Sequence, residues 1–92
     1  MVLKIFTRET CPNCLPAKIL GEKLEKGKLV KVEWYDVDEV DGMAEAAFYM
    51  IMVTPSLTLI DGETIVKTWR GEVPDSKEIR VEVRNYGRSR MA

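Results

Sequence analysis

The chain carries two cysteines, in the stretch Cys11-Pro12-Asn13-Cys14. This spacing brings the two thiols within one helical turn of each other, close enough to form a disulfide without rearranging the backbone. The sequence contains no histidine, so both the usual general base and the commonest metal ligand are absent. Any chemistry that this chain performs is therefore expected at the two sulfurs.

The position of the motif predicts different roles for the two thiols. A thiol attacks as its thiolate, which a helix N-terminus stabilises through its partial positive charge and free backbone N–H groups. We expect a helix to start at the motif, with Pro12 at the first position, where a missing N–H costs nothing. Cys11 would then be the exposed, acidified thiol that attacks a substrate disulfide. Cys14, more buried, would attack Cys11 in turn, which releases the substrate and leaves an intramolecular disulfide.

The composition predicts one small globular domain over residues 1–92, with 46% hydrophobic residues. A net charge of −1 gives no reason to expect a nucleic-acid partner. No apolar run approaches the ~20 residues that span a bilayer, and the first six residues are too short and too quickly charged for a signal peptide. We therefore expect a cytoplasmic monomer. In a reducing compartment a lone Cys-x-x-Cys is more often catalytic or metal-binding than a structural staple.

Apolar periodicity and turn signals predict an alternation of strands and helices. The strands are expected at residues 2–7, 29–37, 56–60 and 64–69, and the first two helices from the motif to Gly27 and over residues 43–49. Asp41 is a candidate N-cap in the acidic turn before the second helix. The last helix is expected to begin at a capping box of Asp75 and Glu78 and to end before a frayed basic tail, residues 87–92.

This order, βαβ followed by ββα, predicts an α/β fold with a four-stranded mixed sheet and helices on both faces. Two strands joined through a helix run parallel with a right-handed crossover, and Asp61-Gly62 predicts an antiparallel hairpin. Five of residues 2–7 are β-branched or apolar, which indicates a strand that is buried on both faces.

Thr54-Pro55 is the second candidate feature. A proline that opens a strand forfeits a ladder hydrogen bond, and a cis X–Pro bond is rare enough to indicate a purpose. We predict that this bond is cis and lies against the Cys11–Cys14 pair. The backbone of Thr54 would then be open to pair with an extended substrate segment. The alternative is that Pro55 simply ends a loop.

Taken together, these motifs resemble the thioredoxin/glutaredoxin superfamily over about residues 2–86: Cys-Pro-Asn-Cys after a first strand, a Val-Thr-Pro strand start, an Asp-Gly hairpin and a glycine-containing loop before the last helix. The resemblance implies a thioredoxin-like fold, Cys11 as nucleophile, Cys14 as resolving thiol and Pro55 as a cis-proline. The chain looks similar to small glutaredoxin-like thioredoxins, which donate electrons to ribonucleotide reductase. The substrate-binding residues that we expect are Pro12, Asn13, Val53, Thr54, Pro55 and Gly71.

Two departures from the family pattern bear on the reductant and on proton transfer. Glutaredoxins usually carry a Gly-Gly pair and an Asp after the fourth strand, which help to hold glutathione, whereas this chain has one glycine there, Gly71. We therefore expect a thioredoxin-reductase-like reductant in preference to glutathione, with disulfide-containing client proteins as substrates. Thioredoxins also carry a buried acid in the first strand. Ile5 takes that position here, so proton uptake by Cys14 would need another group or water.

Other functions remain open at this point. One is a glutathione-dependent glutaredoxin, and another is a metal or iron–sulfur carrier. Zinc prefers four ligands, so two cysteines without histidine would require a dimer or carboxylates, and a cluster would be shared between two subunits. The pair could also be an inert structural one. We expect no resident cofactor other than the redox-active disulfide.

The run from Met50 to Val53 is apolar and leads directly into Thr54-Pro55. We favour packing in the core for this run, because exposed apolar patches are the exception. The alternative is an apolar rim where partner proteins dock, which adaptable methionine side chains would suit.

Overall fold

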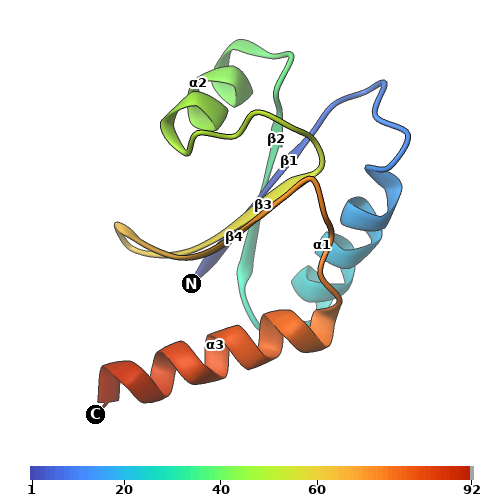
Figure 1. The fold of residues 1–92 in the computed structure, drawn as a ribbon. Coiled ribbons are helices and arrows are strands. Elements are labelled where there is room, and N and C mark those ends of the chain that lie inside the picture. Colours follow the sequence, from blue (N-terminus) through green and yellow to red (C-terminus); the bar gives the residue numbers. More distant parts are fainter. Residues whose placement is uncertain (92) are drawn as a thin grey trace.

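The computed structural model describes the backbone of residues 1–91 and the side chains of residues 1–88. The elements in chain order are β1 (Val2–Thr7), α1 (Leu15–Gly27), β2 (Lys31–Asp36), α2 (Val40–Phe48), β3 (Ser56–Asp61), β4 (Thr64–Arg70) and α3 (Ser76–Met91). The sheet has the strand order β2-β1-β3-β4 (Figure 1). β1 and β2 run parallel, and the other neighbouring pairs are antiparallel. The predicted α/β fold with a four-stranded mixed sheet is thus confirmed.

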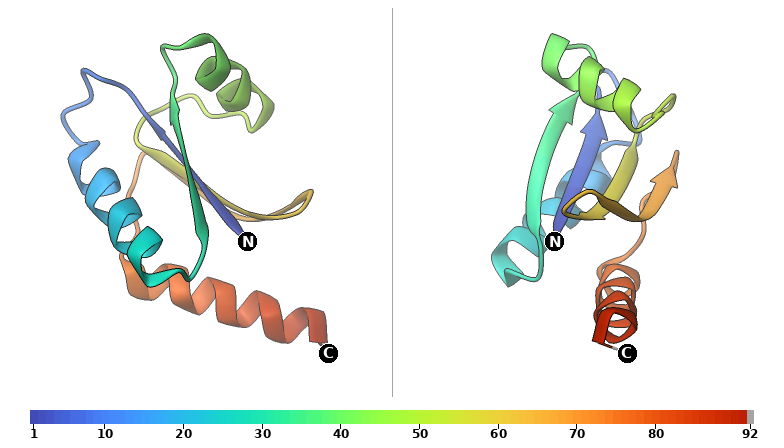
Figure 2. Two further views of the ribbon diagram at one scale, coloured as in Figure 1. Left: turned by 180° about the vertical axis from the view of Figure 1, so that it is seen from behind. Right: turned by 90° about the vertical axis from the view of Figure 1, so that its left-hand side faces the viewer.

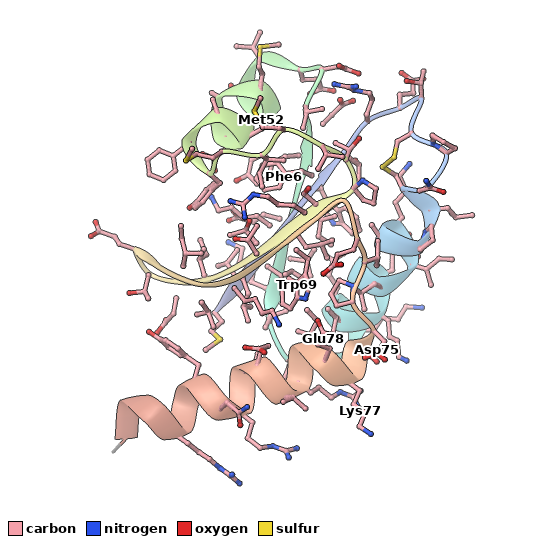
Figure 3. The ribbon with its side chains drawn as sticks, in the orientation of Figure 1. Phe6, Met52, Trp69, Asp75, Lys77 and Glu78 are labelled. Atoms are coloured by element: carbon pink, nitrogen blue, oxygen red, sulfur yellow. A yellow bond between two sulfur atoms is a disulfide. The ribbon has the colours of Figure 1, made fainter. Side chains whose placement is uncertain are left out.

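Helices cover both faces of the sheet. α1 and α3 lie on one face and α2 lies on the other (Figure 2). The central strand β1 is buried on both sides, as its composition predicts: Leu3 and Ile5 pack against α1, whereas Phe6 packs on the opposite face against Ala46 of α2. Trp69 of β4 belongs to the α1 side of the core (Figure 3).

The strand directions bring four connections to one edge of the sheet. β1 and β2 end at this edge because they are parallel. β3 is antiparallel to β1, so it begins there, and β4 ends there because it is antiparallel to β3. The loop with Cys11 and Cys14, the turn after β2, the segment before Ser56 and the residue after Arg70 therefore meet at the same edge.

Lys4 of β1 ties α2 to the sheet. Its Nζ lies 2.7 Å from Oε2 of Glu45 in α2, and 3.4 Å from the hydroxyl of Tyr35. Desolvation by burial lowers the pKa of Lys4, but the hydrogen bonds to Glu45 and Tyr35 outweigh it and hold the pKa above its ordinary value. Burial also raises the pKa of Tyr35, whose hydroxyl donates a hydrogen bond to Glu33. This cluster positions α2 and, with it, the segment that leads to Pro55.

The start of α1 differs from the prediction. The helix begins at Leu15 and not at the motif, with Cys14 as its N-cap and Pro16 in its first turn. Because the first N–H groups of a helix have no intrahelical partner, Pro16 fits there without loss. Pro12 is equally compatible with the first turn of a helix, so the local sequence does not distinguish the two prolines. The folded loop around the disulfide does.

Other boundaries also move. β2 is shorter than predicted, and α2 begins at Val40 with Glu39 as N-cap, so it takes in most of the predicted acidic turn and Asp41 is not the cap. Gly42 explains this early start, because a Cβ there would lie 1.9 Å from the Asp36 carbonyl oxygen. Without a side chain, the first turn of α2 can pack directly against the end of β2.

The last helix is capped as predicted, since the N–H of Glu78 donates to Oδ1 of Asp75 at 2.8 Å. α3 does not end before Gly87, however, but continues to Met91. Basic residues near a helix C-terminus interact favourably with its dipole, and no proline interrupts this segment. Ala92, the end of the predicted tail, lies outside the described residues. Over residues 1–91, no helix is both long enough and apolar enough to cross a membrane.

Candidate active site

Cys11 and Cys14 form a disulfide, with the two Sγ atoms 2.10 Å apart and the two Cα atoms 5.4 Å apart. The N–H of Cys11 donates to the Arg8 carbonyl at 3.1 Å, and the N–H of Cys14 donates to the Cys11 carbonyl at 3.4 Å. The Cys14 carbonyl in turn accepts from the N–H of Lys18. Two successive turns therefore connect β1 to α1 and carry the pair at the edge of the sheet.

The two cysteines differ in exposure. Cys11 is half-buried, Pro12 and Asn13 are exposed, and Cys14 is only 2% exposed. Cys14 is thus the more buried sulfur, as expected, although Cys11 precedes the helix and does not lie in its first turn. Since Cys14 is the N-cap, the positive end of the α1 dipole still lies beside the pair. A substrate that approaches from solvent reaches Cys11 first.

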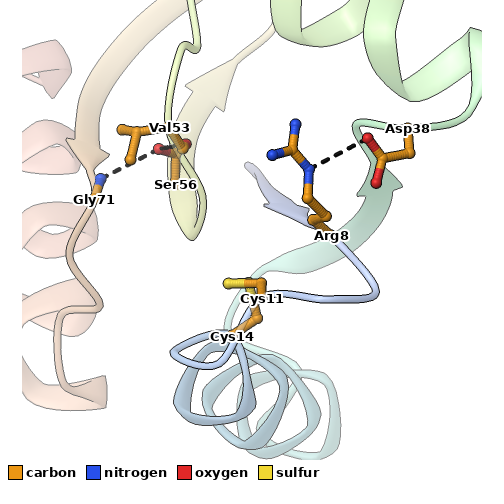
Figure 4. Close-up of a disulfide and its surroundings, with 7 residues drawn as sticks. All are labelled: Arg8, Cys11, Cys14, Asp38, Val53, Ser56 and Gly71. Atoms are coloured by element: carbon orange, nitrogen blue, oxygen red, sulfur yellow. Dashed lines mark hydrogen bonds and ion pairs between the residues drawn. A yellow bond between two sulfur atoms is a disulfide. The ribbon is translucent and has the colours of Figure 1, made fainter.

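The Thr54-Pro55 segment forms the opposite wall of the site. The Thr54-Pro55 peptide bond is cis, as predicted. Val53 and Ser56, which flank it, lie at the same edge of the sheet as the disulfide, and their side chains are directed toward Gly71 (Figure 4). Within residues 1–91, neither the N–H nor the carbonyl of Thr54 takes part in a hydrogen bond. The backbone at Thr54 is therefore open to pair with an extended segment of another chain.

Ser56 holds this wall in place. Its buried hydroxyl donates to the Val53 carbonyl at 2.6 Å and accepts from the N–H of Gly71 at 3.3 Å. The same N–H also donates to the Pro55 carbonyl at 2.9 Å. Gly71 has a φ of +72°, in the left-handed region that favours glycine. The sequence pointed to Val53, Pro55 and Gly71 but not to Ser56, whose only signal is its position after the proline at a strand start.

Arg8 and Asp38 connect the cysteine loop to the turn after β2. Nε of Arg8 lies 3.2 Å from Oδ1 of Asp38, and both side chains are about half exposed (Figure 4). An exposed ion pair contributes little to stability, so its relevance lies in the charge balance beside Cys11. No pattern in the sequence singles out either residue.

The core beneath the disulfide holds no buried ionisable side chain within residues 1–88. Ile5 is fully buried in the core against α1, and the buried polar residues are Ser56 and Thr58. No group of three or more cysteine or carboxylate side chains in the described part of the chain is arranged to hold a metal ion. A proton that enters or leaves Cys14 must therefore travel through the exposed side of the site.

The residues before Thr54 are only partly packed in the core. Ile51 is 7% exposed, but Met50 and Met52 are 73% and 92% exposed, so the preferred interpretation of core packing is wrong for both methionines. Met50 has a positive φ of 57°, and the N–H of Ile51 donates to the Ala46 carbonyl. This turn directs Ile51 inward and leaves its two neighbours in solvent.

Comparison with known proteins finds similarity to thioredoxins. Residues 1–83 match a family model described as a thioredoxin domain. A probable thioredoxin from Archaeoglobus fulgidus is 31% identical over 84 residues, which cover 91% of this chain and 87% of that protein. Thioredoxin 1 from Thermosipho africanus superposes with a TM-score of 0.77 at 16% identity and covers all of both chains. Fasciola hepatica thioredoxin superposes with a TM-score of 0.72 at 20% identity, over 90% of this chain and 78% of its own.

Proposed function

The chain belongs to the thioredoxin-domain family, and from this premise we propose that it reduces the disulfides of client proteins by exchange at Cys11 and Cys14. The family and a cysteine pair at disulfide-bonding distance support thiol–disulfide oxidoreduction. One observation favours protein disulfides in particular. The backbone of Thr54, which makes no hydrogen bond within residues 1–91, lies at the same edge of the sheet as the cysteine pair and can pair with an extended client segment.

In the proposed reaction the Cys11 thiolate attacks one sulfur of the client disulfide. A bond forms between Cys11 Sγ and that sulfur, and the other client sulfur leaves as a thiolate and takes up a proton. Cys14 then loses its proton and attacks Cys11 Sγ, which releases the second client thiol. Two electrons have passed to the client, and the protein is left in the oxidised state described above.

The difference in exposure supports this order of events. Cys11 meets the client because it is the accessible sulfur, whereas Cys14 is shielded from outside thiols but lies within bonding distance of Cys11. Because no ionisable side chain is buried in the core within residues 1–88, water on the exposed side accepts the proton of Cys14.

A second reductant must return two electrons and two protons to the disulfide. We propose a thioredoxin-reductase-like partner in preference to glutathione, since Gly71 is the only glycine in the loop after β4. Glutathione is an anionic tripeptide, and Arg8, in the loop that leads to Cys11, is already paired with Asp38. The protein is proposed to act as a cytoplasmic monomer without a resident cofactor.

Reduction of insulin tests this proposal with two recycling systems in parallel. Thioredoxin reductase with NADPH is expected to sustain turnover, and glutathione with glutathione reductase is expected to sustain much less. Replacement of Cys11 by serine should abolish turnover with either system, because no other accessible thiol is present. Turnover that survives in Cys11→Ser would contradict the proposal, and efficient recycling by glutathione alone would favour a glutaredoxin.

A further inference from the structure

The outer side of α3 carries an uninterrupted row of basic side chains. Four of them are exposed and form what we term the α3 basic stripe: Lys77, Arg80, Arg84 and Arg88. They follow one another at intervals of three or four residues, so they share one face of the helix. Figure 3 shows Lys77 directed away from the sheet. The stripe reaches Arg88 because α3 continues to Met91, where the sequence predicts a frayed tail.

The acidic residues of α3 lie on its other side and are bound to β4. Glu78 accepts a hydrogen bond from the indole N–H of Trp69. Oε1 of Glu82 lies 3.5 Å from Nζ of Lys67, and the helix contains no further acidic residue. Within residues 1–88, none of the four cations of the stripe forms an ion pair. The positive charge of the stripe is therefore free to meet a partner from outside the chain.

The spacing of the stripe costs stability in the isolated chain. Arg84 has Arg80 four residues before it and Arg88 four residues after it, and like charges at this spacing destabilise a helix. No acidic residue lies three or four positions away from any cation of the stripe. A partner that brings negative charge to this face would remove the repulsion.

The surroundings of the stripe favour a protein partner over a nucleic acid or a membrane. Proteins that bind these extended polyanions through charge normally have a basic domain, whereas this chain has a net charge of −1. Tyr86, the aromatic residue of α3, lies two turns after the buried Ile79 and so on the core side, which leaves no ring in the stripe on which a base could stack. Val81 is 39% exposed among the cations, and an apolar side chain gains contact from a protein but not from phosphates.

We propose that the α3 basic stripe binds an acidic helix of a partner protein. A helix with Asp or Glu at three- and four-residue intervals presents carboxylates about 4.5 to 6 Å apart along its axis, the same rise as the cations. An apolar residue among them would pack on Val81, and arginine guanidinium groups bind carboxylates through two parallel hydrogen bonds. α3 lies at the end of the molecule opposite the loop that carries the cysteines (Figure 1, Figure 2), so a bound partner leaves Cys11 accessible.

Fluorescence anisotropy of a labelled helical peptide measures this binding. The peptide carries four glutamates at the spacing of the stripe and one leucine among them. It contains no cysteine, so the result does not depend on the proposed disulfide exchange. A scrambled peptide of the same composition, with its glutamates on all faces of the helix, is the reference. We expect the wild-type protein to bind the matched peptide about tenfold more tightly, which corresponds to about 1.4 kcal/mol.

Variants of the protein locate the binding on the helix. Arg80→Gln/Arg84→Gln should bind the matched peptide about tenfold more weakly and should stay folded, because glutamine is a good helix former. Lys23→Gln/Lys26→Gln is the matched control, since it removes the same charge from exposed positions of α1, and it should change the affinity by less than about twofold. Val81→Gln should weaken binding of the matched peptide about threefold.

Equal affinities of the wild-type protein for the two peptides would overturn the inference, as would equal losses in the two double variants. A Val81→Gln variant that binds the matched peptide like the wild-type protein would also overturn it, because charge alone would then explain the binding. Oligo-dT and vesicles that contain phosphatidylserine test the other polyanions. If either binds the wild-type protein more tightly than the matched peptide at the same salt concentration, the assignment of an acidic helix is wrong.

Discussion

The hydroxyl of Ser56 connects the segment before β3 to the residue that follows β4. Its removal gives the sharpest structural prediction. In Ser56→Ala the Val53 carbonyl loses its partner at 2.6 Å, whereas the N–H of Gly71 keeps the Pro55 carbonyl at 2.9 Å. Both hydrogen bonds of the hydroxyl are lost, and the Val53 carbonyl is the group left without its partner. Because this hydrogen bond is only partly buried, we expect a cost of about 1.5 kcal/mol.

Urea unfolding of the oxidised protein measures this cost, and thermal unfolding should show a Tm lower by roughly 6–12 °C for a domain of this size. The loosened wall should also reduce kcat/KM for insulin by about threefold to tenfold, through misplacement of Thr54. Thr58→Val is the matched control. Thr58 is buried on the same strand, but its hydroxyl contacts Thr68 and not the wall.

Thr58→Val is therefore expected to reduce stability without changing kcat/KM by more than about twofold. The reasoning is refuted if Ser56→Ala matches the wild-type protein in both stability and rate. It is also refuted if Thr58→Val slows the reaction as much as Ser56→Ala does, since the rate would then follow stability alone.

Three further predictions follow from the fold. Reduction of the disulfide opens a closed loop of four residues. In urea unfolding the oxidised protein should therefore be about 2 kcal/mol more stable than the reduced protein, and equal stability of the two forms would contradict this. The folded-state pKa of Lys4 lies above its unfolded value, so the stability that Lys4 contributes is complete at neutral pH and decreases as the pH rises above about 10. Between pH 9 and 11 the wild-type protein should therefore lose about 1 kcal/mol more stability than Lys4→Met, and parallel pH curves for the two proteins would contradict this role of Lys4. Gly42→Ala should destabilise the protein by about 2–3 kcal/mol, because the added Cβ would collide with the Asp36 carbonyl. Gly27→Ala is the control and should not destabilise it, because a Cβ at Gly27 would have no neighbouring atom within 4 Å. Similar unfolding curves for the two variants would contradict the close packing of Gly42.

Much of the fold could be predicted because its signals are local. The alternation of strands and helices, the Asp61-Gly62 hairpin and the Asp75 cap each depend on a few adjacent residues, and the structure confirms them. The cysteine pair and the cis Thr54-Pro55 bond were also readable, because their residue types are rare in those positions.

The remainder depends on contacts between distant residues. The start of α1 is set by the folded cysteine loop, and the start of α2 by the approach of Gly42 to the end of β2. The Ser56 hydroxyl has its structural role because the fold places Gly71, which follows β4, within hydrogen-bonding distance of it. A bulge near Ile60 turns Ile65 out to solvent although the pattern places it on the same face as Trp69.

The exposure of Met50 and Met52 could not be predicted for the same reason. Their composition is that of a core segment, and a single left-handed residue, Met50, decides which side chains point inward. The sequence alone places the site correctly, but the exposure of the side chains beside it depends on the folded chain.

The central claim is that Cys11 attacks the client and Cys14 resolves the mixed disulfide, and trapping tests it most directly. Cys14→Ser and Cys11→Ser are each reduced, incubated with oxidised insulin and analysed by mass spectrometry without reductant. The account predicts a covalent client adduct at Cys11 in Cys14→Ser, and little or none at Cys14 in Cys11→Ser, because Cys14 is buried. Equal adducts in the two variants, or an adduct that forms only at Cys14, would contradict it.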